Sequence, residues 1–111
     1  MFNTIWRTVY RWVDVRLPPR KLKVIQGDTL PAKMPMRTLI LARDGSEDWC
    51  IGLKCPCGCG RTIELLLPED MSPNWSYKLD GQGQATLSPS VWLKGGCASH
   101  FWIRQGRIEW V

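Results

Sequence analysis

The sequence of 111 residues contains a single histidine, and this scarcity restricts the acid–base chemistry that the chain can perform. Histidine is the residue type whose ordinary pKa suits a base near neutral pH. Zinc hydrolases commonly carry an H-E-x-x-H or H-x-E signature, and this sequence has neither. The absence argues against metal-assisted hydrolysis, and it places any histidine-dependent chemistry at His100.

Long apolar runs are also missing from the sequence. No stretch reaches the roughly 18 apolar residues that a transmembrane helix needs. The N-terminus lacks a basic segment followed by an uninterrupted apolar core. The sequence therefore predicts neither a membrane span nor a signal peptide, and we expect a cytoplasmic protein.

Excess positive charge is absent from most of the chain. The formal net charge is +5, but residues 1–23 hold six basic side chains against Asp14 alone, which accounts for all of it (6 − 1 = +5). The remaining residues hold nine basic and nine acidic side chains. The body of the protein thus has no surplus of cations for phosphate backbones, and we expect no nucleic-acid partner.

The chain has five cysteines, an odd number, and four of them are clustered in two short segments. A secreted disulfide scaffold usually has an even and dispersed set. The pattern therefore favours a reduced metal site over disulfides or inert buried thiols. With seven Trp and a hydrophobic fraction of 44%, the chain predicts one globular domain with a modest core, which a metal would help to stabilise.

The cysteine knuckle, Cys55-Pro56-Cys57-Gly58-Cys59-Gly60, is followed about forty residues later by Cys97-Ala98-Ser99-His100. Structural zinc takes four ligands, and these segments offer five candidates, so two ligand sets compete. One set is Cys55, Cys57, Cys59 and Cys97, which leaves His100 free. The other combines two knuckle thiols with Cys97 and His100. We favour the all-cysteine set, which has no open position and therefore predicts structural zinc. An iron–sulfur cluster is less favoured.

Hydrophobic periodicity predicts an amphipathic helix over residues 2–17, ended by Pro18-Pro19. Alternating runs bounded by turn residues predict strands over residues 21–26, 37–43, 49–53, 61–67, 75–79, 84–88, 91–93, 100–104 and 107–111, with Pro89 separating 84–88 from 91–93. We expect a mostly β (α+β) fold, a small antiparallel sheet domain with a zinc knuckle and one N-terminal amphipathic helix. The expected division is 1–19 for the helix and linker and 20–111 for the zinc-stabilised β domain.

The role of the predicted helix 2–17 stays open at this level. Its two sides differ in character: Phe2, Ile5, Trp6, Val9, Val13 and Leu17 share one side, and Asn3, Arg7, Arg11 and Asp14 share the other. Packing of the helix on the sheet is the favoured interpretation. Docking to a partner and contact with a membrane surface are the alternatives.

A serine nucleophile is the chemistry that His100 suits best if cysteines alone bind the metal. Ser99 is a poor candidate, because adjacent residues of a strand point to opposite faces. Ser90 follows Pro89 at the start of a predicted strand, where a fixed bend can present its hydroxyl, and a Ser90–His100 dyad would meet the requirement for an activated serine. The plainer alternatives are a turn residue at Ser90 and a zinc ligand or structural residue at His100. Nothing in the spacing selects a third catalytic residue, although Glu109 is available.

Taken together, the motifs resemble a family of small bacterial proteins formerly catalogued as a domain of unknown function. The motifs that carry the resemblance cover roughly residues 20–111: Asp28-Thr29-Leu30-Pro31, the cysteine knuckle, Ser88-Pro89-Ser90-Val91-Trp92, Cys97-Ala98-Ser99-His100-Phe101-Trp102-Ile103-Arg104 and Ile108-Glu109-Trp110. Members of that family occur in operons of bacterial ubiquitination-like (Bub) pathways, beside ubiquitin-like proteins and E1-like and E2-like enzymes.

The resemblance implies a serine peptidase that processes the ubiquitin-like protein or removes it from targets. Position by position, it implies Ser90 as nucleophile, His100 as base and a zinc site at Cys55, Cys57, Cys59 and Cys97. The expected partners are the ubiquitin-like protein with its conjugates and the E1-like and E2-like proteins. The alternative function is a non-catalytic, zinc-ribbon-like adaptor that binds a partner protein through its sheet edge and tryptophans.

Overall fold

The computed structural model describes residues 4–111, and within them the chain forms one helix and eight strands. In chain order these are α1 (Thr4–Asp14), β1 (Lys21–Gln26), β2 (Thr38–Asp44), β3 (Glu47–Lys54), β4 (Thr62–Leu66), β5 (Ser76–Leu79), β6 (Ala85–Trp92), β7 (His100–Arg104) and β8 (Arg107–Trp110). The expectation of a mostly β fold with one N-terminal helix is confirmed.

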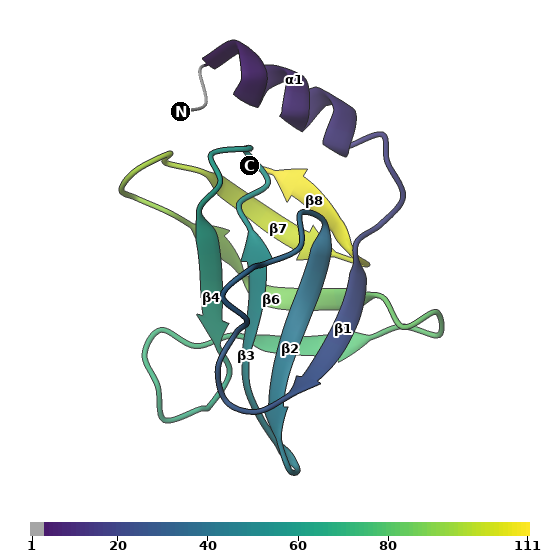
Figure 1. Cartoon of the computed structure of the whole chain (residues 1–111), viewed down its shortest axis with the longest axis vertical. Helices are drawn as coiled ribbons and strands as arrows, with labels where there is room; N and C mark the ends of the chain where they lie inside the picture. Colours follow the sequence, from purple (N-terminus) through teal and green to yellow (C-terminus); the bar gives the residue numbers. More distant parts are fainter. Residues whose placement is uncertain (1–3) are drawn as a thin grey trace.

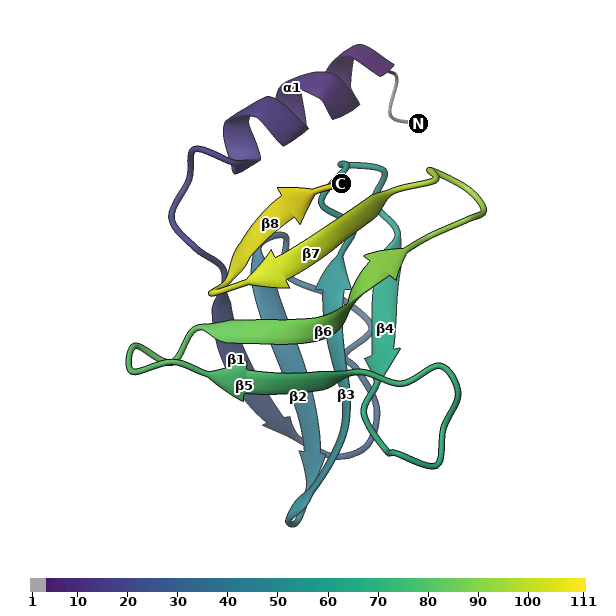
Figure 2. The same cartoon turned by 180° about the vertical axis from the view of Figure 1, so that it is seen from behind.

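The strands form two four-stranded sheets, in the orders β1-β2-β3-β4 and β5-β6-β7-β8. Their strands run in steeply different directions, one sheet behind the other, in the two opposite views of Figures 1 and 2. Every pairing is antiparallel except that of β1 with β2, which is parallel. The long connector after β1 allows this, since a parallel pair cannot be joined by a short turn.

The core lies between the two sheets: β4, β7 and β8 alternate buried and more exposed side chains, whereas β2 and β3 each carry a run of four buried residues. In the second sheet Leu87, Val91, Phe101 and Ile103 are at most 2% exposed and meet a matching apolar set from β2, β3 and β4. Such burial is worth about 1.5–3 kcal/mol for each large apolar side chain. The outward residues between them, on the opposite face of β6 and β7, include both members of the predicted dyad.

Strand β6 differs from expectation in an informative way. We expected two strands, 84–88 and 91–93, separated by Pro89, but residues Ala85–Trp92 form one strand. Instead of a break at Pro89, the strand has an irregularity in its pairing with β7, between Leu87 and Val91. Proline lacks the N–H that a regular ladder needs, so the strand bulges there instead of ending. The bulge lies directly at Ser90.

Helix α1 begins at Thr4 and ends at Asp14, inside the expected range of 2–17; residues 2 and 3 of that range lie outside the described residues. A tight turn follows the helix, with the Arg16 and Leu17 amides donating to the Val13 and Asp14 carbonyls. Within residues 4–111, no helix has the length and apolar character required to cross a membrane.

The helix docks on the body mainly through its polar side. Asp14 is 3% exposed, and its carboxylate pairs with Arg20 at 2.8 Å and with Arg37 at 2.8 Å. Tyr10 is 9% exposed and lies against Gly58 of the knuckle. The helix therefore lies across the knuckle end of the sandwich, above β7 and β8 in Figure 1, and not on an apolar sheet face.

Candidate active site and metal centre

The cysteine knuckle is the loop that joins β3 to β4. Its base is closed by the Cys55 amide, which donates to the Arg61 carbonyl at 2.8 Å. The loop reverses direction at Gly58 and Gly60, whose φ angles of 86° and 85° are in the left-handed region that favours glycine. A side chain at Gly58 would also collide with Tyr10 of α1. These two glycines let the backbone curl so tightly that three thiols point to one side.

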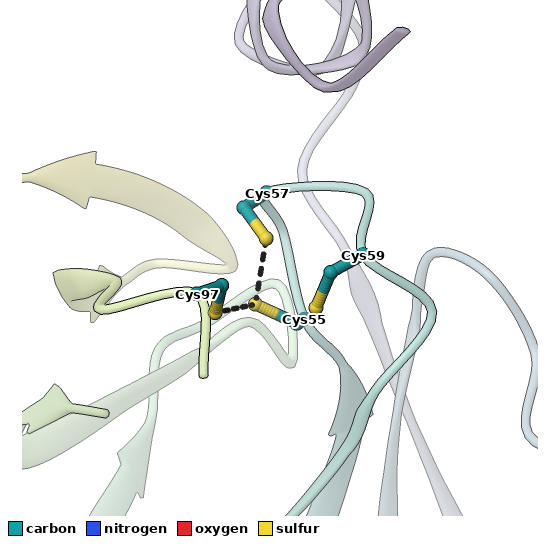
Figure 3. A group of neighbouring side chains, drawn as sticks. All are labelled: Cys55, Cys57, Cys59 and Cys97. Carbon is teal, nitrogen blue, oxygen red and sulfur yellow. Dashed lines mark hydrogen bonds between the residues drawn. The ribbon is translucent and has the colours of Figure 1, made fainter. Parts of the chain in front are cut away.

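Four thiols meet where the knuckle contacts the β6–β7 loop. The sulfurs of Cys55, Cys57, Cys59 and Cys97 all lie within 4.8 Å of one another. Figure 3 shows the three knuckle thiols facing Cys97, with Cys55 Sγ 3.3 Å from Cys57 Sγ and 3.6 Å from Cys97 Sγ. Cys50, on β3, is buried outside this group. The sequence prediction that the remote cysteine joins the knuckle is in agreement with this geometry.

The donor set fits a tetrahedral thiolate-binding metal ion such as zinc. Zinc–thiolate bonds of about 2.3 Å in a tetrahedron place the sulfurs about 3.8 Å apart, close to the observed separations. All five cysteines are free thiols in the structure. Burial raises the pKa of Cys55, so a cation is needed to hold this thiol as a thiolate. Burial also acts to raise the pKa of the Cys97 thiol. Hydrogen bonds from Ser99 and the neighbouring thiols outweigh burial, so the pKa of Cys97 is lowered to about 6.

Helix α1 covers the four-thiol cluster from the side of Cys57. The negative charge of Cys57 raises the pKa of the Arg7 guanidinium, and the Cys97 and Cys59 thiols act in the same direction. A four-thiolate site around a divalent cation carries a net charge of −2, so a guanidinium beside it is favourable. Arg7 and Tyr10 thus tie the helix to the knuckle, as Figure 3 shows for the helix passing above Cys57.

Ser99 and His100 are adjacent in sequence, but their side chains face opposite sides of the sheet. Ser99 is 6% exposed, and its hydroxyl lies 3.2 Å from Cys97 Sγ and 3.7 Å from Cys55 Sγ. The next residue, His100, starts β7 and points to the outer face of the sheet, as strand alternation requires. The expectation that Ser99 cannot reach the imidazole agrees with this arrangement.

Ser90 and His100 form a hydrogen-bonded pair on that outer face, with Ser90 Oγ 3.0 Å from His100 Nε2. His100 is the cross-strand partner of Trp92, so Ser90, two residues before Trp92, lies on the same face and diagonally across from the imidazole. Both side chains are half-buried. The distance is within the range expected of a serine nucleophile and its general base. We name this pair the Ser90–His100 dyad.

Trp92 fixes the plane of the imidazole. Its ring stacks on His100 with centroids 5.0 Å apart and an interplanar angle of 12°. Trp92 is nevertheless 57% exposed, and the Lys94 ammonium lies over its ring, 4.7 Å from the centre. Sequence reasoning did not assign Trp92 this role, although its i+2 spacing from Ser90 on a strand would have placed it on the same face.

A third, orienting carboxylate is absent from the described residues around His100, where no Asp or Glu oxygen lies within 4 Å of a ring nitrogen. Glu109, the available candidate, pairs with Arg104 at 2.6 Å instead. The orientation of His100 is therefore set by Ser90 and by the Trp92 stack.

A cavity of about 250 Å³ opens between α1 and the ends of β7 and β8. His100 lines it together with Arg7 and Arg11 of the helix and Trp110 of β8, among others. The Arg11 guanidinium lies 3.8 Å from the centre of the Trp110 ring. The cavity therefore borders residue His100, and two of its lining side chains are cations.

The sequence that carries the thiol cluster and the Ser90–His100 dyad matches a known protein family. Residues 26–111 match the family described as the bacterial ubiquitination-like system serine protease (BubE). The chain belongs to this family. No curated protein and no solved structure matches the chain. The resemblance noted from the motifs is thereby confirmed, and a serine protease of a bacterial ubiquitination-like system is the activity that the BubE family name states.

The BubE match begins within β1 and includes the knuckle, Ser90 and His100. Helix α1 and its linker precede it. Arg7, Tyr10 and Arg11 therefore contact the metal centre and the cavity from outside the family-defining region. Their contacts were not evident from the sequence, because only the tertiary fold brings residue 10 to residue 58.

Proposed function

We propose that the protein is a zinc-stabilised serine peptidase of a bacterial ubiquitin-like conjugation pathway. In this proposal Ser90 is the nucleophile, His100 is the general base, and Cys55, Cys57, Cys59 and Cys97 hold a structural zinc ion. The observation that carries the proposal is the 3.0 Å contact between Ser90 Oγ and His100 Nε2 in a member of the BubE family.

The reaction follows from the arrangement of the dyad. His100 Nε2 accepts the proton of Ser90 as the serine oxygen attacks the scissile carbonyl, and the resulting imidazolium then protonates the leaving amine. A water activated by the same imidazole hydrolyses the acyl-enzyme, which restores Ser90. Trp92 keeps the imidazole from rotating during both transfers, because stacking restricts the ring to one plane.

The metal has a structural task in this scheme. When bound, zinc joins the β3–β4 knuckle to the β6–β7 loop, and four thiolate ligands leave no position for water or substrate. The loop that ends in Cys97, Ala98 and Ser99 runs directly into His100. Holding Cys97 therefore fixes the start of β7 and, with it, the position of the imidazole relative to Ser90.

The substrate is an extended peptide, which we propose to be the C-terminal tail of the ubiquitin-like protein or its linkage to a target. Strand β5 pairs with β6 only as far as Ser88, so Pro89–Trp92 have β7 on one side and no strand of residues 4–111 on the other. An extended tail added at this edge would run beside Ser90, with backbone hydrogen bonds for affinity and the exposed Trp92 as an apolar contact. E1-like and E2-like proteins of the same pathway are further proposed partners, in a proposed cytoplasmic setting.

Cleavage of a fusion between the ubiquitin-like protein and a reporter tests the proposal. The wild type should cleave the fusion, and Ser90→Ala should not. Ser88→Ala is the matched control, since Ser88 lies two residues away on the same strand and its side chain is exposed. Normal cleavage by Ser90→Ala, or none by the wild type, would contradict the peptidase proposal. A binding protein without activity would then be the alternative.

A further inference from the structure

The outward side of α1 is an apolar surface that neither the fold nor the proposed dyad uses. Ile5, Val9, Trp12 and Val13 follow the spacing of one helix face. They are exposed by 75%, 48%, 60% and 37% of their surface. We call these four residues the α1 outer face. Exposed apolar patches of this kind on a small protein mark an interaction site.

The orientation of this face is built into the docked helix. Asp14 is buried and bonded to both Arg20 and Arg37, and Arg11 stacks on Trp110, so the polar side of α1 is held against the body. Rolling the helix over to bury its apolar side would leave these charges without partners, which is costly for buried groups. The α1 outer face therefore stays turned to the surroundings as long as the helix is docked.

The charged residues near the α1 outer face indicate what kind of partner it binds. Asp14 is the single acidic residue of the segment 4–23, and both of its oxygens are bonded inside the protein. Arg16 follows Trp12 by one helical turn; its guanidinium lies 3.9 Å from the centre of the Trp12 ring and is exposed. Lys21 and Lys23 beyond it are exposed as well. The outward surface of this segment thus combines apolar side chains and cations, with no exposed acid.

We propose that α1 is a membrane-surface helix that binds anionic lipid bilayers. The α1 outer face enters the boundary between headgroups and acyl chains, where indole rings are favoured, and Arg16 lies at the headgroup phosphates. The helix is about 16 Å long, so it lies along the surface and does not cross. This property is separate from the proposed peptidase activity, because α1 precedes the residues matched by the BubE family.

Co-sedimentation of the full, zinc-loaded chain with lipid vesicles tests the proposal. We expect binding to vesicles that contain phosphatidylglycerol, weak binding to vesicles of phosphatidylcholine alone, and a decline of binding as salt is raised. Val9→Asp should weaken binding at least tenfold, because it places a charge in the apolar stripe. Leu79→Asp is the matched control, since Leu79 on β5 is 50% exposed and lies on another element. Its binding should equal that of the wild type.

A second pair of variants tests the charge. Arg16→Gln should weaken binding to anionic vesicles about fivefold, and Lys78→Gln, which removes an exposed cation from β5, should not. Quenching by brominated lipid reports the depth of Trp12. Trp12→Phe should keep most of the binding while losing a large share of the quenching.

Several outcomes would overturn the proposal. These are no sedimentation with anionic vesicles, equal binding to neutral and anionic vesicles, or equal losses in Val9→Asp and Leu79→Asp. A wild type that elutes as a dimer, converts to a monomer in Val9→Asp and ignores vesicles would assign the α1 outer face to a second copy of the chain instead.

Discussion

The metal centre and the dyad are neighbours in the sequence and differ in almost every physical respect. Ser99 faces the buried thiols, and the next residue, His100, faces the half-exposed Ser90 and Trp92. The four thiols are a closed donor set, whereas the dyad lies on an open sheet face beside an unpaired stretch of β6. One side of the strand is suited to holding the structure, and the other is suited to reacting with a substrate.

This contrast explains why a cluster of cysteines is not by itself evidence for catalysis. A fully coordinated ion cannot activate water, so the proposed contribution of a metal at these thiols is to keep two loops together. The proposed reactive groups, Ser90 and His100, are ordinary residues whose placement depends on those loops. Variants that damage one site and spare the other should therefore separate fold from activity.

Replacing the histidine should produce the largest effect. His100→Ala should lower kcat/KM for the fused ubiquitin-like substrate by on the order of 10⁴-fold, because within residues 4–111 no other base is hydrogen-bonded to Ser90. Stability and zinc content should be unchanged. Combining it with Ser90→Ala should cause little further loss, since the two residues act as a unit. Loss of zinc from His100→Ala would instead assign the histidine to the metal site and remove the proposed base.

Removing the metal should affect the fold first. Chelation, or Cys57→Ser, should lower the free energy of unfolding by about 4 kcal/mol when free zinc in the reference sample is a thousandfold above its Kd. Thermal unfolding with and without chelator measures this, and activity should fall along with stability. As a control, Cys50→Ser lies outside the cluster and should retain one zinc per chain. A chelated protein of unchanged stability would contradict a structural metal.

Ser99→Ala tests whether Ser99 belongs to the thiol cluster or to the dyad, since it lies one residue from His100. The variant loses the hydroxyl that contacts Cys97 and Cys55, so zinc affinity should fall about 10- to 100-fold. With saturating zinc, kcat should stay near the wild-type value. Competition with a chromogenic chelator measures the affinity. A Ser99→Ala variant that binds zinc normally and fails to cleave would mean that Ser99 belongs to the reactive site.

Trp92→Ala should have a moderate effect on catalysis alone. Loss of the stack frees the imidazole, and an aromatic pair of this kind is worth about 0.5–1.5 kcal/mol, or roughly 2- to 12-fold in kcat. Trp92→Phe should restore most of the activity, because it preserves a stacking ring. If kcat stays constant and only KM rises in Trp92→Ala, the ring binds substrate and does not position His100.

The smallest effect is expected far from both sites, at the β2–β3 hairpin end. A hydrogen bond from Arg43, aided by one from Tyr77, lowers the pKa of Asp48 despite its partial burial. Because the folded pKa is below the unfolded value of about 3.9, the contribution is present above that pH and is lost as the pH falls through the folded pKa. Asp48→Asn should cost about 0.5–1 kcal/mol at pH 7.

The pH dependence of unfolding checks the prediction for Asp48. The stability of Asp48→Asn should decline less steeply than that of the wild type below about pH 4. Zinc content and kcat should be the same in both proteins. Identical pH profiles would mean that the Arg43–Asp48 pair contributes nothing to stability.

Much of this arrangement can be predicted from the sequence, because local patterns determine it. Alternation places His100 opposite Ser99, and the knuckle spacing brings three thiols together with Cys97. The division at residue 19 stays a prediction. The docking of α1 could not be foreseen, because the amphipathic pattern favoured packing of the helix on the sheet and gave no sign that its polar side would face the body. The ion pairs of Asp14 with Arg20 and Arg37, the latter 23 residues away, decide the orientation instead. The parallel pairing of β1 depends likewise on a connector without regular pattern.

The proposed function requires Ser90 to react while the four-cysteine metal site stays fully coordinated. Native mass spectrometry of the zinc-loaded protein after treatment with a fluorophosphonate probe tests it most directly. We expect one adduct per chain, located on Ser90 by peptide mapping, with one zinc ion retained and no labelling of Ser90→Ala. An adduct on another residue, or labelling that releases the zinc, would contradict it.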